Sequence, residues 1–263
     1  MTDPVLLNIS PGRTAVITLN RPEKRNAFNR EMIDGLSEMF ELIAKNDDAV
    51  RVVVLRGAGE TFCAGADLNW MKDAASYTLD QNREDAEALA EMLRALHDLP
   101  QMTIALVQGA AMGGGAGLVA ACDVAVAVKD TSFRFSEVRL GLTPATISPF
   151  VVKAIGPRWA RALFASAEGF DAEFAHKIGL VQYVVDSVDE IGNMDEYLVK
   201  VAFAAAPGAV ADAKVLVDDV YGQEITHGLM KDLAKRIAHR RASDEGKEGL
   251  TAFLEKRKPN WAE

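Results

Sequence analysis

Two short loops in the sequence carry few side chains and could hold an anion with their backbone. One spans residues 56–68 (RGAGETFCAGADL) and the other spans residues 108–118 (QGAAMGGGAGL). Small residues leave backbone N–H groups uncovered, and the first amides of a helix have no acceptor within that helix. One N–H group from each loop, aimed at the same carbonyl oxygen, would form an oxyanion hole. The sequence therefore predicts stabilisation of negative charge that develops on an oxygen atom.

The three glycines at 113–115 do not match the known nucleotide-binding motifs. The stretch GGGAG lacks the Lys-Ser/Thr pair of a P-loop, and no acidic residue completes a dinucleotide fingerprint. Glycine-rich turns also occur where the chain only needs tight packing. On these residues alone, both an anion site and a purely structural turn remain open.

Each of the two loops follows a stretch that we predict to be a buried strand. β-branched runs bounded by turn residues predict strands at 14–20, 50–57, 103–109 and 123–128. Apolar residues at helical spacing predict helices near 29–43 and 86–99 between them. Alternating strands and helices are typical of a largely parallel α/β core. Loops after parallel strands open onto one crevice, so the two loops should meet there.

From about Ser148 onward the chain has a helical pattern. Only residues 180–185 (LVQYVV) interrupt it as a predicted strand, and a final helix should begin near Ser243. We therefore expect an α/β core over residues 1–188 and a helical C-terminal region over residues 189–263.

Composition excludes several classes of protein. The chain has 263 residues, of which 49% are hydrophobic, enough for one sizeable core. A formal charge of −9 argues against binding to nucleic acid or to acidic membranes. No stretch resembles a membrane span or a secretory signal, so a cytoplasmic location is expected. Cys63 and Cys122 lack metal-ligand or disulfide spacing, and we expect no metal site.

Several motifs together resemble the enoyl-CoA hydratase/isomerase (crotonase) superfamily along nearly the whole chain. They are TLNRPEKRNAF, FCAGADL, GAAMGGGAGLVAACDVAVA, FRFSEVRLGLTP and AFLEKRKPNW, in that order. The resemblance implies a spiral of stacked ββα units with a helical C-terminal region used for trimer assembly. It also implies a homotrimer or a dimer of trimers. Acyl-CoA thioesters would be the substrates, so coenzyme A would belong to the substrate and no separate cofactor is expected.

The resemblance assigns catalytic roles to three positions and shows one departure. The backbone amides of Ala66 and Gly114 would form the oxyanion hole, and Glu137 would be the acid/base. Without the surrounding motif, Glu137 would read as an ordinary solvated carboxylate. The second glutamate of the family's hydratases falls on Gly117. We expect Gly117 to leave a space near the β-carbon of the acyl group, where a methyl branch could lie.

Further positions are implied to bind the substrate. Trp70 and Met112 would line the acyl pocket with Gly117. Arg134 or Arg139 could supply a cation for a carboxylate at the distal end of the acyl group. The positions that would contact coenzyme A are Lys24, Arg25, Ala27, Ala64, Asp67, Leu68 and, from a neighbouring subunit, Phe253 and Lys256.

Three functions are open at this stage. The stretches GADLNWM and GLTPATISPFVVKAIG resemble bacterial methylglutaconyl-CoA hydratase-like proteins, which favours hydration of a branched enoyl-CoA. With Glu137 as the only family glutamate, a Δ3,Δ2-enoyl-CoA isomerase is the alternative, because moving a double bond needs one proton shuttle. A non-catalytic acyl-CoA-binding protein is the third.

Overall fold

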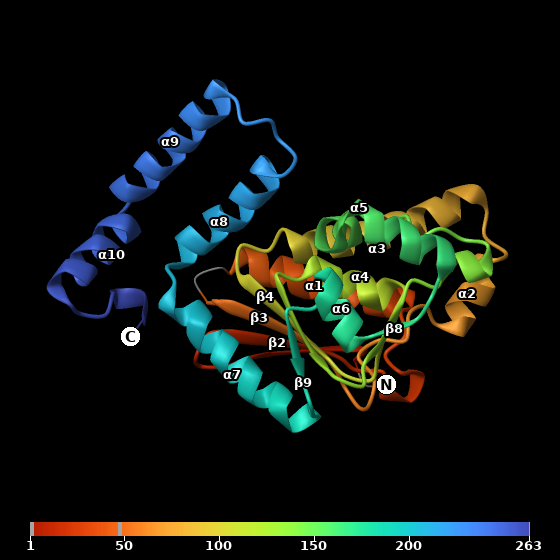
Figure 1. Cartoon of the computed structure of the whole chain (residues 1–263). Coiled ribbons are helices and arrows are strands. Elements are labelled where there is room, and N and C mark those ends of the chain that lie inside the picture. The colour runs from red at the N-terminus through yellow and green to blue at the C-terminus, as the bar shows by residue number, and fades with distance from the viewer. Residues whose placement is uncertain (1–2, 47–48, 263) are drawn as a thin grey trace.

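The computed structural model describes residues 3–46 and 49–262. The protein is built on a main sheet of six strands, which Figure 1 shows at the centre of the molecule. The strand order is β1-β2-β3-β4-β6-β9. β1 and β2 pair antiparallel, and the other neighbours pair parallel. The strands are β1 (Val5–Ile9), β2 (Thr14–Leu19), β3 (Val52–Gly57), β4 (Met102–Val107), β6 (Val124–Val128) and β9 (Tyr183–Val185).

A second, smaller sheet is formed by short strands that mostly follow strands of the main sheet in the chain. It contains β5 (Ala110–Met112), β7 (Ser132–Arg134) and β8 (Phe170–Asp171), with β5 and β7 parallel. The chain passes from β4 to β5, and from β6 to β7, through a short turn in each case. β5 and β7 therefore belong to a different sheet from the strands that precede them, and the expected mixed α/β architecture is confirmed.

Helices cover the main sheet on both faces. α1 (Arg30–Lys45), α3 (Leu79–His97), α4 (Gly114–Ala121) and α5 (Ser148–Ser166) gather on one face (Figure 1). α7 (Val188–Ala204) covers the other, where Ile191 and Leu198 are buried against Ile104 and Val126. α1 forms because its apolar residues repeat at helical spacing and because Asn29 accepts a hydrogen bond from the Met32 N–H.

The last helices, α8 (Pro207–Val220), α9 (His227–Ala242) and α10 (Asp244–Glu255), project away from the sheet (Figure 1). α8 and α9 are joined by ion pairs, such as the one between Arg236 and Asp219 at 2.5 Å. Among the described residues neither helix buries a side chain fully, while Val217 and Ile225 are 62% and 82% exposed. The projecting arm thus presents an apolar surface with nothing from its own chain over it.

The structure also contains two short helices, α2 (Leu68–Ala74) and α6 (Ala172–Ile178). Of the helices in residues 3–46 and 49–262, none combines the length and the apolar character that crossing a membrane requires.

A buried asparagine ties the N-terminal loop to the loop after β3. Asn26 is fully buried, and its Nδ2 donates to the carbonyls of Ala58 and Thr61 at 2.9 and 2.7 Å. Its Oδ1 accepts a hydrogen bond of 2.9 Å from the Arg21 N–H. The amide side chain therefore replaces a stretch of backbone pairing between two loops far apart in sequence.

Replacing Asn26 by alanine should loosen both loops at once. Loss of three buried hydrogen bonds, at about 1 kcal/mol each, should lower Tm by about 6–12 °C in a differential scanning experiment. Asn8→Ala, on the exposed face of β1, is the control and should leave Tm within about 2 °C. Equal Tm values for the two variants would show that Asn26 does not tie the loops.

Candidate active site

The backbone around Ala66 is held by a short parallel pairing with Phe28. The Phe28 N–H donates to the Gly65 carbonyl, and the Asp67 N–H donates to the Phe28 carbonyl, both at 2.7 Å. In such a pairing the Gly65 carbonyl and the Asp67 N–H point toward Phe28. The Ala66 N–H belongs to the same peptide group as the Gly65 carbonyl and therefore points away from Phe28. That amide is fixed in direction while remaining exposed.

A second parallel pairing brings Gly114 to the same place. Cys63 pairs with Ala111, with hydrogen bonds of 3.0 Å between Cys63 N and Ala110 O and between Met112 N and Cys63 O. Three residues beyond this pair, one segment reaches Ala66 and the other reaches Gly114. Both segments run in the same direction, so the two amides arrive at the same end of the pairing.

Neither amide is used inside the protein. Within residues 3–46 and 49–262, the N–H groups of Ala66 and Gly114 donate no hydrogen bond to another group. Gly114 is also the first residue of α4, where free amides and the helix dipole favour negative charge. These two groups are the donors that the oxyanion-hole hypothesis requires.

Each glycine of the run at 113–115 faces a different neighbour. A Cβ on Gly113 would lie 3.2 Å from Oε1 of Glu137, and one on Gly114 would lie 2.9 Å from the Phe28 ring. A Cβ on Gly115 would overlap Cys63, at 2.7 Å from its Cβ. Gly113 additionally has a φ of 49°, which favours glycine. Tight packing, one of the two alternatives left open by the sequence, is thus confirmed, and the anion site stays a prediction.

Glu137 stands beside this run of glycines. It follows β7 as the first residue of a short 3₁₀ helix, η2 (Glu137–Leu140), and its carboxylate lies next to Gly113, the residue before Gly114. Its Oε2 is buried and has no hydrogen-bond partner among the described residues. Burial raises the pKa of Glu137, and a hydrogen bond from its own backbone N–H only partly offsets this.

This arrangement suits proton transfer next to a carbonyl. A carbonyl oxygen held by the amides of Ala66 and Gly114 would gain negative charge when a proton leaves the adjacent carbon. Each such donor lowers the barrier by about 3 kcal/mol. The partly desolvated carboxylate of Glu137 can accept and return the proton, since its raised pKa brings it closer to neutral pH.

The expectation that Gly117 leaves an open space is wrong. Gly117 is buried, and a Cβ on it would lie 2.4 Å from Cγ2 of Ile147 and 3.6 Å from Cδ1 of Leu93. The side chain of Ile147, itself only 1% exposed, fills the volume in question. Gly117 is therefore a close-packing position under the site and does not widen the pocket.

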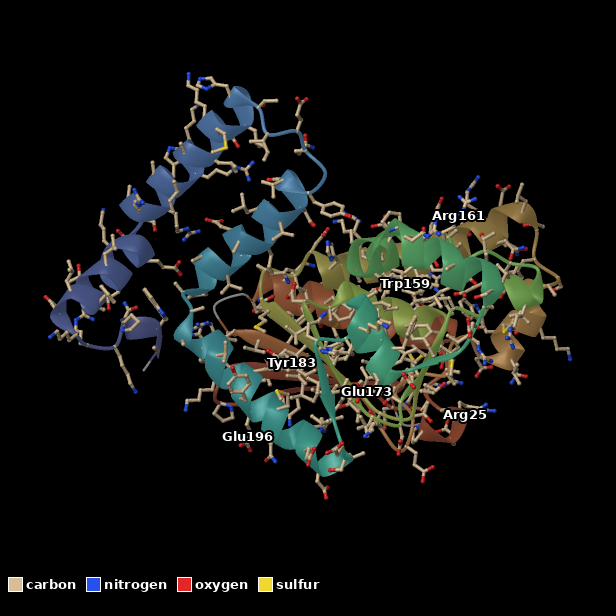
Figure 2. The ribbon with its side chains drawn as sticks, in the orientation of Figure 1. Arg25, Trp159, Arg161, Glu173, Tyr183 and Glu196 are labelled. Atoms are coloured by element: carbon tan, nitrogen blue, oxygen red, sulfur yellow. The ribbon has the colours of Figure 1, made fainter. Side chains whose placement is uncertain are left out.

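The two candidate arginines differ in position. Arg134 turns toward Gly169, whose Cβ would lie 2.7 Å from its Nη2, and it lines a separate cavity of about 990 Å³. Trp159 of α5 and Glu173 of α6 line the same cavity, which Glu137 does not line (Figure 2). Arg139 is exposed on η2, two residues from Glu137. Arg134 therefore faces away from the proposed reaction centre, and Arg139 remains beside it.

The positions expected to contact coenzyme A fall into two groups. Lys24 and Arg25 are exposed on the N-terminal loop, where Figure 2 labels Arg25, and Leu68 is 81% exposed at the start of α2. Ala27 is buried and Ala64 is half-buried, so their contribution would come mainly from the backbone. Asp67 is buried, and its carboxylate accepts hydrogen bonds from Arg21 Nη2 at 2.9 Å and from Asn69 N at 2.8 Å. Its side chain thus holds the loop.

The remaining predicted residues lie apart from one another. Trp70 on α2 and Met112 at the end of β5 are half-buried, and Trp70 packs against the core. Phe253 and Lys256 are exposed at the end of α10, on the arm that projects away from the sheet (Figure 1). Neither tail residue lies at the site of its own chain.

The sequence patterns did not identify two residues that shape the site. Phe28 orients Ala66 and packs on Gly114, and Ile147 packs on Gly117. Only their apolar character is visible in the sequence, and that does not distinguish them from other core residues. Cys63 lies in the same region, and burial raises the pKa of its thiol to about 12, which keeps it protonated.

Comparison with known proteins agrees with this geometry. Residues 11–263 match the family model described as enoyl-CoA hydratase/isomerase. The chain belongs to the enoyl-CoA hydratase/isomerase family. A short-chain-enoyl-CoA hydratase of Clostridium acetobutylicum is 33% identical over 258 residues, which cover 94% of this chain and 93% of that protein. The family's chemistry makes this chain an enzyme that acts on acyl-CoA thioesters.

Solved structures confirm the crotonase fold. Pseudomonas aeruginosa AtuE is 37% identical, with a TM-score of 0.94 over 99% of this chain and 100% of that one. An enoyl-CoA hydratase of Shewanella pealeana is also 37% identical, with a TM-score of 0.94 over 98% of this chain and 96% of that one. A Legionella pneumophila protein assigned to the enoyl-CoA hydratase/isomerase (crotonase) group is 44% identical, with a TM-score of 0.92 over 99% and 100%.

The raised pKa of Glu137 predicts a pH-dependent effect on stability. A carboxyl whose pKa is raised in the folded protein stabilises it below the unfolded pKa of about 4.3, and this contribution is lost as pH rises through the folded value. Glu137→Gln stays neutral at every pH. We expect its Tm to exceed that of the unsubstituted enzyme at about pH 8, with a smaller difference at about pH 5. A difference that grows toward low pH would show that the site favours the ionised form.

Proposed function

We infer that this enzyme adds water to an α,β-unsaturated acyl-CoA thioester, with a branched substrate such as 3-methylglutaconyl-CoA as the best candidate. The observation that carries the proposal is the carboxylate of Glu137 beside Gly113, next to the free amide of Gly114. In this proposal the amides of Ala66 and Gly114 hold the thioester oxygen, and Glu137 handles the protons. Coenzyme A is part of the substrate, and the reaction requires no further cofactor.

One carboxylate can perform both proton transfers. Glu137 takes a proton from water while the water oxygen bonds to the β-carbon, and the electron pair of the double bond moves onto the thioester oxygen. The amides of Ala66 and Gly114 hold the resulting enolate. Glu137 then returns its proton to the α-carbon, so that the elements of one water molecule have been added.

Isomerisation of a 3-enoyl-CoA is the second candidate, and one observation favours it. The sequence of α4, GGAGLVAA, contains no acidic residue, so this helix offers no second carboxylate. Glu137 alone could remove a proton from the α-carbon and return it to the γ-carbon, with the dienolate held by the same two amides.

The choice of a branched substrate rests on the resemblance of GADLNWM and GLTPATISPFVVKAIG to methylglutaconyl-CoA hydratase-like proteins. A terminal carboxylate on such a substrate would need a cation near Glu137. Arg139 is the exposed arginine on the same short helix, and we assign it this role. The phosphates of coenzyme A would be bound by Lys24 and Arg25, which are both exposed.

Replacing Glu137 by glutamine should abolish most turnover. Loss of a general acid/base lowers kcat/KM by about 10²–10⁴-fold. Hydration removes the absorbance of a conjugated 2-enoyl thioester, whereas isomerisation of a 3-enoyl-CoA creates it. The direction of the absorbance change with each substrate therefore distinguishes the two functions. Glu38→Gln, on the exposed face of α1, is the control and should keep full activity. Unchanged turnover of both substrate types in Glu137→Gln would contradict the proposal.

We also propose that the arm formed by α8, α9 and α10 assembles the enzyme into a trimer or a dimer of trimers. Its exposed apolar residues, among them Val217 and Ile225, lack any cover from the described part of their own chain. A surface of this kind marks a protein contact. Phe253 and Lys256 on the same arm would then reach the substrate of a neighbouring subunit.

Charges on this arm should separate the subunits. Light scattering should give a mass of three or six times the chain mass of 28.4 kDa for the unsubstituted enzyme. Val217→Asp/Ile225→Asp should lower it toward one chain mass, because a buried unpaired carboxylate is costly. Val188→Asp, at the exposed start of α7, should not change it. A monomeric unsubstituted enzyme would overturn the assembly.

A further inference from the structure

The first turn of α4 separates two side chains of opposite character. Gly113 adjoins the carboxylate of Glu137, and Gly117 adjoins the side chain of Ile147. The Gly117 N–H donates to the Gly113 carbonyl at 3.0 Å, so the two glycines are one helical turn apart, about 5.4 Å along the axis. The same short stretch of helix therefore has an acid/base at one end and a branched apolar group at the other.

Ile147 is fixed in its place. It is the N-terminal flanking residue of α5, where its carbonyl accepts a hydrogen bond of 3.1 Å from Val151 N. Just after it, the Ser148 hydroxyl donates to the Ala145 carbonyl at 2.8 Å. Its β-branched side chain has few rotamers, and the neighbouring Leu93 closes the other side of the Gly117 contact. Ile147 cannot turn aside to admit a larger residue at position 117.

The contact between Gly117 and Ile147 leaves no room for any side chain at position 117. A Cβ there would lie 2.4 Å from Cγ2 of Ile147, a distance that real Cβ atoms essentially never show, and 3.0 Å from Cβ of the same residue. A carboxylate cannot be introduced at position 117 by one substitution, because the partner on α5 must shrink as well. The glycine and the isoleucine are complementary in volume, like two halves of one packing unit.

We propose that Ile147 is a specificity-determining residue that keeps this enzyme a one-carboxylate catalyst. It occupies the volume that a side chain at position 117 would enter, so position 117 stays a glycine and Glu137 acts alone in both hydration and isomerisation. This inference rests on the proposed role of Glu137. The packing part of it does not, and the two can be tested apart.

Three variants test the proposal through stability, namely Gly117→Glu, Ile147→Gly and the two combined. Gly117→Glu should lower Tm by about 5 °C or more because it overpacks a rigid site, and Ile147→Gly should do so because it leaves a cavity. The combined variant should lose clearly less than the sum of the two losses. Additive losses would overturn the complementarity. Gly117→Ala, with and without Ile147→Gly, repeats the test with a smaller side chain if the glutamate variant does not fold.

The same variants test specificity through kinetics. The combined variant should hydrate 2-butenoyl-CoA at least about tenfold faster than Ile147→Gly, with a lower ratio of isomerisation to hydration. Its pH profile should show a second acidic group that is absent from Ile147→Gly. Recovered stability without these changes would overturn the specificity role of Ile147. Full activity of Glu137→Gln would instead refute the proposed function and leave the stability coupling intact.

Discussion

The site depends on one kind of interaction, the parallel backbone pairing of three loop segments outside the main sheet. Phe28 pairs with Ala66, and Cys63 pairs with Ala111. These few hydrogen bonds orient peptide groups that no side chain could direct as firmly, because a peptide plane has little freedom once both neighbours are bonded. The amides of Ala66 and Gly114 lie at the same end of these pairings and stay unused because the hydrogen bonds are made by their neighbours.

The second sheet extends the same principle to Glu137, the proposed acid/base. β5 pairs with β7, and the Gly113 N–H donates to the Arg134 carbonyl at 2.9 Å. Glu137 lies three residues after Arg134 in the chain, so the pairing that holds the glycines also fixes where the carboxylate of Glu137 lies. Burial at this position raises the pKa of Glu137 because the charged form loses solvation. Position and acidity thus have a common structural origin.

Close packing explains why the region tolerates so few side chains. Phe28, Cys63 and Ile147 each lie where a Cβ on a glycine of α4 would fall. The glycines therefore let three elements approach one short helix. The same lack of side chains leaves the backbone amide of Gly114 uncovered. Cys63 serves here as a small buried group, since burial raises its pKa to about 12.

Much of this could be predicted from the sequence, because it depends on local pattern. β-branched runs predicted β2, β3, β4 and β6, and helical spacing predicted α1. The free amides of Ala66 and Gly114 followed from bare loops and from family motifs. The sequence could not predict β1, the short strands of the second sheet, or the true start of α3 at Leu79, which lies well before the apolar repeat. It also suggested an empty space at Gly117 and a distal cation at Arg134 or Arg139. Both depend on which residues from distant elements occupy the neighbouring volume, Ile147 in one case and Gly169 in the other. Local propensity carries no information about such contacts, so only the tertiary structure decided them.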